Sequence, residues 1–167
     1  MNITKYTINN SKLLVDGPLG KLARWLRIIG YDTTYDSNLG RMQLVERAID
    51  EDRIILTGSK STHNMCEKRQ IKSVQIYVTS IYQQIKQLIQ ADFIISEPEI
   101  SQSRCSLCNG DLNKTLEAED LDQIPFGTKQ YMLEIYKCNS CKHLYWEGSH
   151  WKKIRSLINQ ALSTDSV

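Results

Sequence analysis

Short apolar runs alternate with amphipathic segments over the first 91 residues of the chain. Runs such as Leu-Leu-Val at 13–15 and Ile-Ile-Leu at 54–56 are typical of strands buried on both faces. Strands are predicted at residues 12–16, 31–35, 53–57 and 73–78. Helices, with apolar residues at three- and four-residue spacing, are predicted at 18–30, 39–50, 61–69 and 80–91. This alternation predicts an α/β fold, with a parallel sheet covered by helices on both faces.

The pattern changes after residue 91. Residues 105–145 are rich in loops and carry the breakers Gly110, Pro125 and Gly127. A last amphipathic segment, 151–162, has apolar residues spaced to dock on the rest of the protein. We therefore expect an α/β domain at 1–95, a cysteine-rich ribbon at 100–150, and a C-terminal helix at 151–167 that packs back on the α/β domain.

Composition is that of a soluble globular protein, with 41% hydrophobic and 24% charged residues. A net charge of +2 is too small to indicate nucleic-acid binding by itself. No apolar run is long enough to span a bilayer, and residues 1–12 lack the apolar stretch of a signal peptide. We expect a cytoplasmic protein without membrane contacts, where reduced cysteines serve as metal ligands.

Four of the five cysteines form two Cys-x-x-Cys pairs, Cys105 with Cys108 and Cys138 with Cys141. Each pair makes a tight turn that presents two thiolates, and two such turns complete a tetrahedral zinc site without an open position. A redox role is the alternative, but a redox pair is expected where a strand leads into a helix, and neither pair has that setting. The spacing predicts one structural zinc ion, with Cys66 as a bystander.

Asp16 ends the first predicted strand, at the edge of a parallel sheet where ligands bind. A carboxylate there can hold Mg²⁺ or Mn²⁺ against a phosphate and activate a water. The alternative is that Asp16 caps the helix that begins near Pro18. Residue type alone favours the cap.

Five sequence blocks carry a family resemblance. They are Leu-Val-Asp at 14–16, Leu-Gly-Lys-Leu-Ala-Arg-Trp-Leu-Arg at 19–27, Gly-Tyr-Asp-Thr at 30–33, Arg-Ile-Ile-Leu-Thr at 53–57, and Tyr-Trp-Glu-Gly-Ser-His-Trp at 145–151. With the cysteine pairs between them, these blocks resemble the Mut-seven C-terminal RNase domain family over nearly the whole chain. The resemblance implies a PIN-like nuclease fold that carries a zinc ribbon.

The resemblance also implies RNA as the substrate, cut by metal-dependent hydrolysis through clustered acids. Asp16 matches the first acid of the family, and Asp32 matches the acid of the Gly-Tyr-Asp-Thr block. Two positions depart from the family pattern: Arg41 stands where an acid opens the second helix, and Ser59 replaces an aspartate after the third strand. Because Mg²⁺ requires several carboxylates, these departures predict an eroded nuclease site.

Basic residues on the first helix and in the closing block are the candidate RNA contacts, because cations neutralise phosphates. These residues are Lys21, Arg24, Arg27, His150 and Lys152. The alternative is that they coat ordinary solvated helices. Three functional hypotheses follow: a relative with an eroded RNase site that binds RNA or a ribonucleoprotein, an active Mg- or Mn-dependent ribonuclease that uses Asp16, and a module that docks a protein partner through the ribbon.

Overall fold

The computed structural model describes residues 11–93, 95–117, 122–124, 126 and 134–163. Strands β1 (Lys12–Val15), β2 (Asp32–Tyr35), β3 (Arg53–Thr57) and β4 (Ser73–Gln75) form a parallel sheet in the order β2-β1-β3-β4. A 3-10 turn, η1 (Gly17–Leu19), leads into helix α1 (Gly20–Ile29), and helices α2 (Arg41–Asp50), α3 (Lys60–Lys68) and α4 (Ile81–Gln90) complete this part. The predicted α/β fold with a parallel sheet is confirmed.

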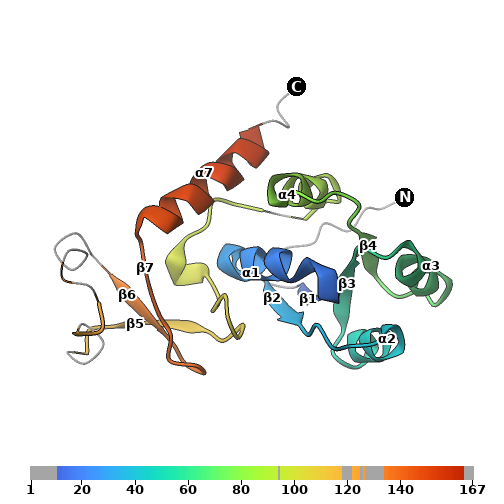
Figure 1. Cartoon of the computed structure of the whole chain (residues 1–167), viewed down its shortest axis with the longest axis horizontal. Helices are drawn as coiled ribbons and strands as arrows, with labels where there is room; N and C mark the ends of the chain where they lie inside the picture. The colour runs from blue at the N-terminus through green and yellow to red at the C-terminus, as the bar shows by residue number, and fades with distance from the viewer. Residues whose placement is uncertain (1–10, 94, 118–121, 125, 127–133, 164–167) are drawn as a thin grey trace.

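Helices cover both faces of the sheet, as Figure 1 shows. Alternate residues of a strand point to opposite faces. Leu13 and Val15 join a cluster with α1 and α4, whereas Leu14 joins a second cluster with α2 and α3. All three side chains are fully buried. Burial on both faces explains why β1 and β3 are continuous apolar runs rather than alternating ones.

The second part is an antiparallel ribbon of β5 (Leu112–Thr115), β6 (Ile135–Cys138) and β7 (Leu144–Trp146), which follows the 3-10 turn η2 (Ile100–Gln102). Helix α7 (Ser149–Ser163) then runs back toward α4 (Figure 1). Ile154 and Ile158 belong to the same buried cluster as Ile85. Residues 127–133, part of the ribbon predicted from the sequence, lie outside the described residues.

Strand β4 ends at Gln75, three residues earlier than predicted. Side chains of α4 donate hydrogen bonds to backbone carbonyls at and after this strand end. Gln87 Nε2 donates to the Gln75 carbonyl at 2.5 Å, and Gln84 Nε2 donates to the Val78 carbonyl at 3.0 Å. Because β4 is the last strand in the sheet order, these half-buried carbonyls take their donors from side chains.

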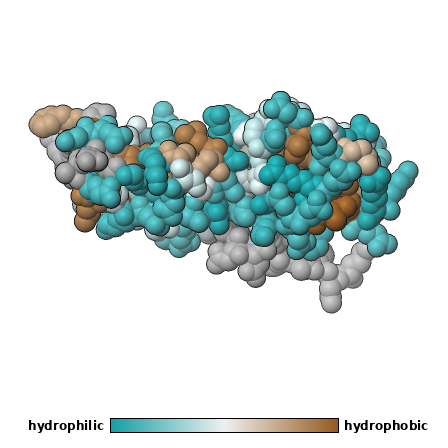
Figure 2. Space-filling model, turned by 90° about the horizontal axis from the view of Figure 1, so that it is seen from below, coloured by the Kyte–Doolittle hydropathy of each residue, from teal (hydrophilic) through white to brown (hydrophobic). Residues whose placement is uncertain are grey.

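The surface is mostly hydrophilic on the face that Figure 2 shows, where hydrophobic residues form separate patches. Within the described residues, no helix is both long and apolar enough to cross a membrane.

Candidate functional site

Asp16 lies at the carboxyl edge of the sheet, between β1 and β3. In the strand order β2-β1-β3-β4, β2 lies on one side of β1 and β3 lies on the other, so the order switches between β1 and β3. Ligands bind at such switch points in open parallel sheets. Asp16 Oδ1 accepts a hydrogen bond from the Gly17 amide at 2.8 Å, and Oδ2 accepts one from the Thr57 hydroxyl at 2.5 Å. The capping role expected from residue type is therefore present. Each carboxylate oxygen still has a second lone pair for another partner.

A groove of about 650 Å³ begins at Gly17, the residue after Asp16, and lies between α1 and the start of α7; Asp16 itself is not among its described lining residues. Lys21 and Arg24 line it from α1, and His150 lines it from α7. All three side chains are exposed. The remaining described lining residues are Gly17, Pro18, Gly20, Trp25, Ile28, Tyr35 and Ser106. The fold thus brings together three of the predicted RNA contacts, whereas Lys152 is exposed on α7 and is not among the lining residues.

The surroundings of Asp16 offer a divalent ion few ligands. Among the described residues, no group of three or more acidic, histidine or cysteine side chains includes Asp16. Ser59 begins α3 as its cap, and its hydroxyl accepts a hydrogen bond from the Thr62 amide at 3.2 Å. Arg41 is exposed at the first turn of α2. A hard divalent ion prefers several carboxylates, so Asp16 alone would hold Mg²⁺ or Mn²⁺ weakly.

The four paired cysteines converge on one point of the ribbon. Their sulfur atoms all lie within 4.8 Å of one another. The Cys105 and Cys141 sulfurs are 3.5 Å apart, and those of Cys108 and Cys138 are 3.4 Å apart. A tetrahedral zinc ion with bonds of about 2.3 Å would place its sulfurs about 3.8 Å apart. The cluster therefore fits a metal ion, and its chemistry is consistent with zinc.

The two cysteine turns repeat the same backbone pattern. The Asn109 amide donates to the Cys105 carbonyl at 2.8 Å, and the Lys142 amide donates to the Cys138 carbonyl at 3.1 Å. Asn109 and Lys142 both have a positive φ, which turns the chain around the sulfurs. At Gly110 a Cβ atom would come within 2.9 Å of the Cys138 sulfur. A side chain at Gly110 would therefore displace a ligand.

Hydrogen bonds and burial shift the acidity of Cys105 in opposite directions. Burial opposes ionisation of Cys105, but the Tyr145 hydroxyl, 3.0 Å from its sulfur, and nearby backbone amides lower the pKa of Cys105 to about 6. Burial and the hydrogen bond to Cys105 raise the pKa of Tyr145. Metal binding requires thiolates, so Tyr145 favours the ligand form of Cys105.

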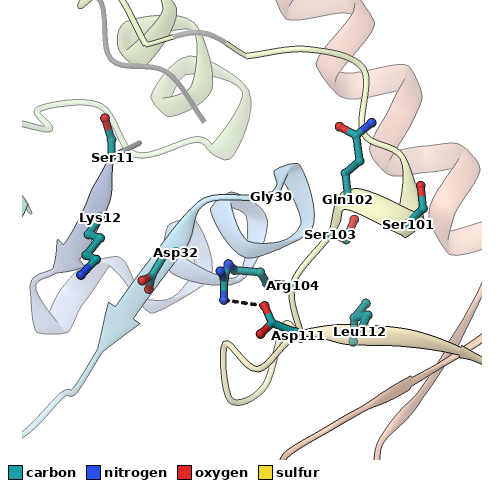
Figure 3. A pocket seen from close by; sticks show the side chains of 10 residues that line it. All are labelled: Ser11, Lys12, Gly30, Asp32, Ser101, Gln102, Ser103, Arg104, Asp111 and Leu112. Carbon is teal, nitrogen blue, oxygen red and sulfur yellow. Dashed lines mark ion pairs between the residues drawn. The ribbon is translucent and has the colours of Figure 1, made fainter. Parts of the chain in front are cut away.

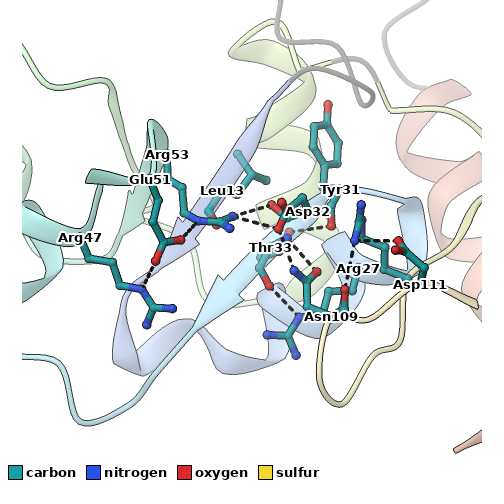
Figure 4. Close-up of polar contacts among 11 residues, drawn as sticks. Leu13, Arg27, Tyr31, Asp32, Thr33, Arg47, Glu51, Arg53, Asn109 and Asp111 are labelled. Atoms are coloured by element: carbon teal, nitrogen blue, oxygen red, sulfur yellow. Dashed lines mark hydrogen bonds and ion pairs between the residues drawn. The ribbon is translucent and has the colours of Figure 1, made fainter. Parts of the chain in front are cut away.

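Asp32 lies at the amino edge of the sheet, away from Asp16. In the parallel pairing of β1 and β2, Asp32 stands beside Lys12, and Asp16 follows four residues later, about 13 Å along the strand direction. Arg53 Nη1 donates to Asp32 Oδ1 at 2.9 Å. Asn109 Nδ2 also donates to Asp32 Oδ1, at 2.7 Å (Figure 4). The structure does not bring the two predicted acids together.

Burial and the polar partners of Asp32 shift its pKa in opposite directions. Its side chain is 25% exposed, and that of Arg53 is 10% exposed. Burial raises the pKa of Asp32, but the hydrogen bonds from Arg53 and Asn109 outweigh it, and the net pKa lies below the ordinary value. The ion pair continues from Arg53 to Glu51 and on to Arg47 (Figure 4). Asp32 is thus a charged structural group that joins the sheet to the first cysteine turn.

Arg27 is buried, although it was expected on the exposed basic side of α1. It is only 6% exposed. Its Nε donates to the Thr33 carbonyl at 2.8 Å, and its Nη1 donates to the carbonyls of Ser106 and Leu107 at 3.0 and 2.9 Å. Burial lowers the pKa of Arg27, and the charges of Cys105 and Cys108 oppose that shift. Arg27 therefore ties α1 and β2 to the first cysteine turn.

A second cleft, of about 470 Å³, lies at the amino edge (Figure 3). Asp32, Arg104 and Asp111 line it, together with Lys12. Arg104 pairs with Asp111 at 3.0 Å, and Asp32 pairs with Arg53. Three of these four charged side chains already have partners, so this cleft is a weaker candidate for ligand binding than the groove beside Asp16.

Several residues that shape these sites were missed from the sequence. Asn109 and Arg53 hold Asp32, and Thr57 holds Asp16. Asn109 directly follows a cysteine pair, and Thr57 is the last residue of a buried strand, so position along the chain was the available signal. Arg53 carries no such signal, because its contact with Asp32 spans strands.

Two comparisons with known proteins bear on identity. No curated protein gives a significant match to the chain. The model of the family described as Mut7-C RNAse domain matches residues 11–158. That match spans the sheet, the groove, the cysteine cluster and most of α7. The chain therefore belongs to the Mut7-C RNAse domain family.

Proposed function

We propose that the protein binds RNA in the groove beside Asp16, that its metal-dependent RNase site is eroded, and that its four cysteines hold one structural zinc ion. The observation that carries the proposal is the position of the groove. Lys21, Arg24 and His150 line it, and it begins at Gly17, the residue that follows Asp16. Family membership supports RNA as the ligand.

The case for an eroded site is electrostatic. In the transition state of phosphodiester cleavage, negative charge increases on the oxygens of a phosphate that is already an anion. The site must therefore supply a cation. Asp16 has no second carboxylate in a metal-binding group among the described residues. Thr57, which is bonded to Asp16, and Ser59, at the position of the family's aspartate, offer only neutral hydroxyls, which are weak ligands for Mg²⁺. Lys21 and Arg24 can contact phosphates without a metal, so the missing carboxylates do not prevent RNA binding.

A binding assay and a cleavage assay on the same RNA test the proposal. Wild-type protein should bind RNA and cleave it poorly with either Mg²⁺ or Mn²⁺. The double variant Arg41→Asp with Ser59→Asp should gain cleavage, and adding Asp16→Asn should remove that gain. Cleavage that does not change with Asp16 would come from a contaminating nuclease and is not counted. Absence of RNA binding would refute the proposal.

An active ribonuclease is the second candidate, favoured by the place of Asp16 beside the groove. Robust wild-type cleavage that Asp16→Asn abolishes would support it against the eroded site.

A protein-docking role has its own observation: Leu116 and Phe126 of the ribbon part are 75% and 89% exposed. Phe126→Ser and Leu116→Ser should leave RNA affinity unchanged if RNA binds in the groove.

A further inference from the structure

The groove beside Asp16 contains two aromatic rings as well as cations. Trp25 of α1 and Tyr35 of β2 both line it, and both are partly buried. Ile28 adds an apolar contact between them and the core. Aromatic rings beside cations are the combination that binds unpaired bases and their phosphates.

The Tyr35 ring is held in place. Its hydroxyl donates to the Gly17 carbonyl at 2.9 Å. The ring lies directly on the backbone of Gly20, where an added Cβ would come within 2.7 Å of the ring. A ring fixed before binding loses little conformational entropy when a ligand stacks on it. Gly20 therefore permits a preformed aromatic wall.

The charges around the rings are complementary to phosphate. Lys21 and Arg24 are exposed, and neither has an ion-pair partner within the described part of the chain. None of the described lining residues is acidic. Trp25 packs partly against the core, which fixes its ring while one part faces the groove. An anion that also presents an aromatic surface fits both features.

We propose that the groove is a stacking slot for an unpaired nucleobase, with Trp25 and Tyr35 as its walls and Lys21 and Arg24 on the adjoining phosphates. This inference rests on the proposed RNA binding and narrows it to single-stranded RNA. In a duplex the base faces are stacked on one another, so the rings would have no partner. An acidic peptide would satisfy the cations and leave the rings without a planar partner.

The first test uses wild-type protein and three ligands: a short single-stranded RNA, an abasic strand of the same length, and the matching duplex. Base stacking predicts that the abasic strand binds about 5- to 100-fold more weakly than the normal strand. The duplex should also bind more weakly than the single strand. Equal affinity for the normal and abasic strands would overturn the stacking slot and leave RNA binding intact.

The second test uses Trp25→Leu with Trp25→Phe as the matched control. Trp25→Leu should weaken binding of the normal strand about as much as base removal does, and should leave the abasic strand unaffected. Trp25→Phe keeps a ring and should stay within about 3-fold of wild type. Trp25→Leu that is folded and binds the normal strand like wild type would overturn the slot. Wild-type protein that binds none of the three ligands would refute the RNA-binding function itself.

Discussion

The two edges of the parallel sheet each carry an aspartate, and the two carboxylates have partners of different charge. Asp16, at the carboxyl edge, accepts hydrogen bonds from neutral groups and adjoins a groove lined by exposed cations. Asp32, at the amino edge, is paired with Arg53 and bonded to Asn109 of the first cysteine turn. A sequence match to a family's acid therefore does not show that the carboxylate is free of a charged partner.

The two arginines of α1 repeat this contrast. Arg24 is exposed on the groove, whereas Arg27, one turn later, is buried against the carbonyls of the first cysteine turn. Buried polar contacts therefore join the amino edge to the cysteine cluster, whereas the groove presents exposed cations. The predictions below test this division, beginning with the largest expected effect.

Loss of the metal should have the largest effect. Purified protein should contain about one zinc ion per chain. Cys105→Ser should release the zinc and unfold the ribbon, because metal-binding energy in such sites is folding energy. Elemental analysis and hydrogen exchange measure the two outcomes. Exchange should also rise at Thr33, whose amide donates to Asn109.

Cys66→Ser is the control for that experiment, since Cys66 lies on α3, buried against the sheet and outside the cysteine cluster. It should leave the zinc content unchanged. A metal-free protein whose ribbon amides remain protected would show that the cysteines are not a structural metal site.

Arg27→Met and Arg24→Met should affect different properties. Arg27→Met leaves three carbonyls without their donor and should lower the free energy of unfolding by about 2–4 kcal/mol. Arg24→Met should change stability by less than about 0.5 kcal/mol, and should flatten the slope of log RNA affinity against log salt by about one unit. Denaturant unfolding and salt titrations measure both. Equal loss of stability in the two variants would contradict the division.

Asp32→Asn and Asp16→Asn extend the same test to the two aspartates. Asp32→Asn breaks the pair with Arg53 and should lower the free energy of unfolding by about 1–3 kcal/mol, with RNA affinity nearly unchanged. Asp16→Asn should remove any effect of Mn²⁺ on RNA binding or cleavage. Asp50→Asn, an exposed position at the end of α2, is the control and should be nearly neutral. Loss of Mn²⁺ dependence in Asp32→Asn would place Asp32 in the reactive site after all.

Acid should lower the free energy of unfolding through protonation of Asp32, and this is the smallest of the expected effects. The pKa of Asp32 is lower in the folded protein than its ordinary value, so its contribution is fully present above about pH 4, the unfolded pKa. That contribution is lost as the pH falls from there through the folded pKa. Stability measured between pH 5 and pH 2 should therefore fall more steeply for wild type than for Asp32→Asn. Parallel curves would show that Asp32 is not a stabilising carboxylate.

The sequence by itself determined the elements and the cysteine cluster. Buried strands such as β1 and β3 are readable because their apolar runs reflect burial on both faces. The cysteine pairs are readable because each depends on a turn of a few residues. Both signals are local, and so they survive without knowledge of the remainder of the chain.

Tertiary structure decided which charged residues face a ligand. Asp32 was placed by the register of β2 beside β1, and Arg27 was buried by a contact with residues about 80 positions later in the chain. The groove itself combines η1, α1, β2, the first cysteine turn and the start of α7. Helical periodicity separates a buried face from an exposed one, but it cannot show that a distant segment covers the exposed face. That is why Arg24 and Arg27 look alike in sequence and differ in the folded protein.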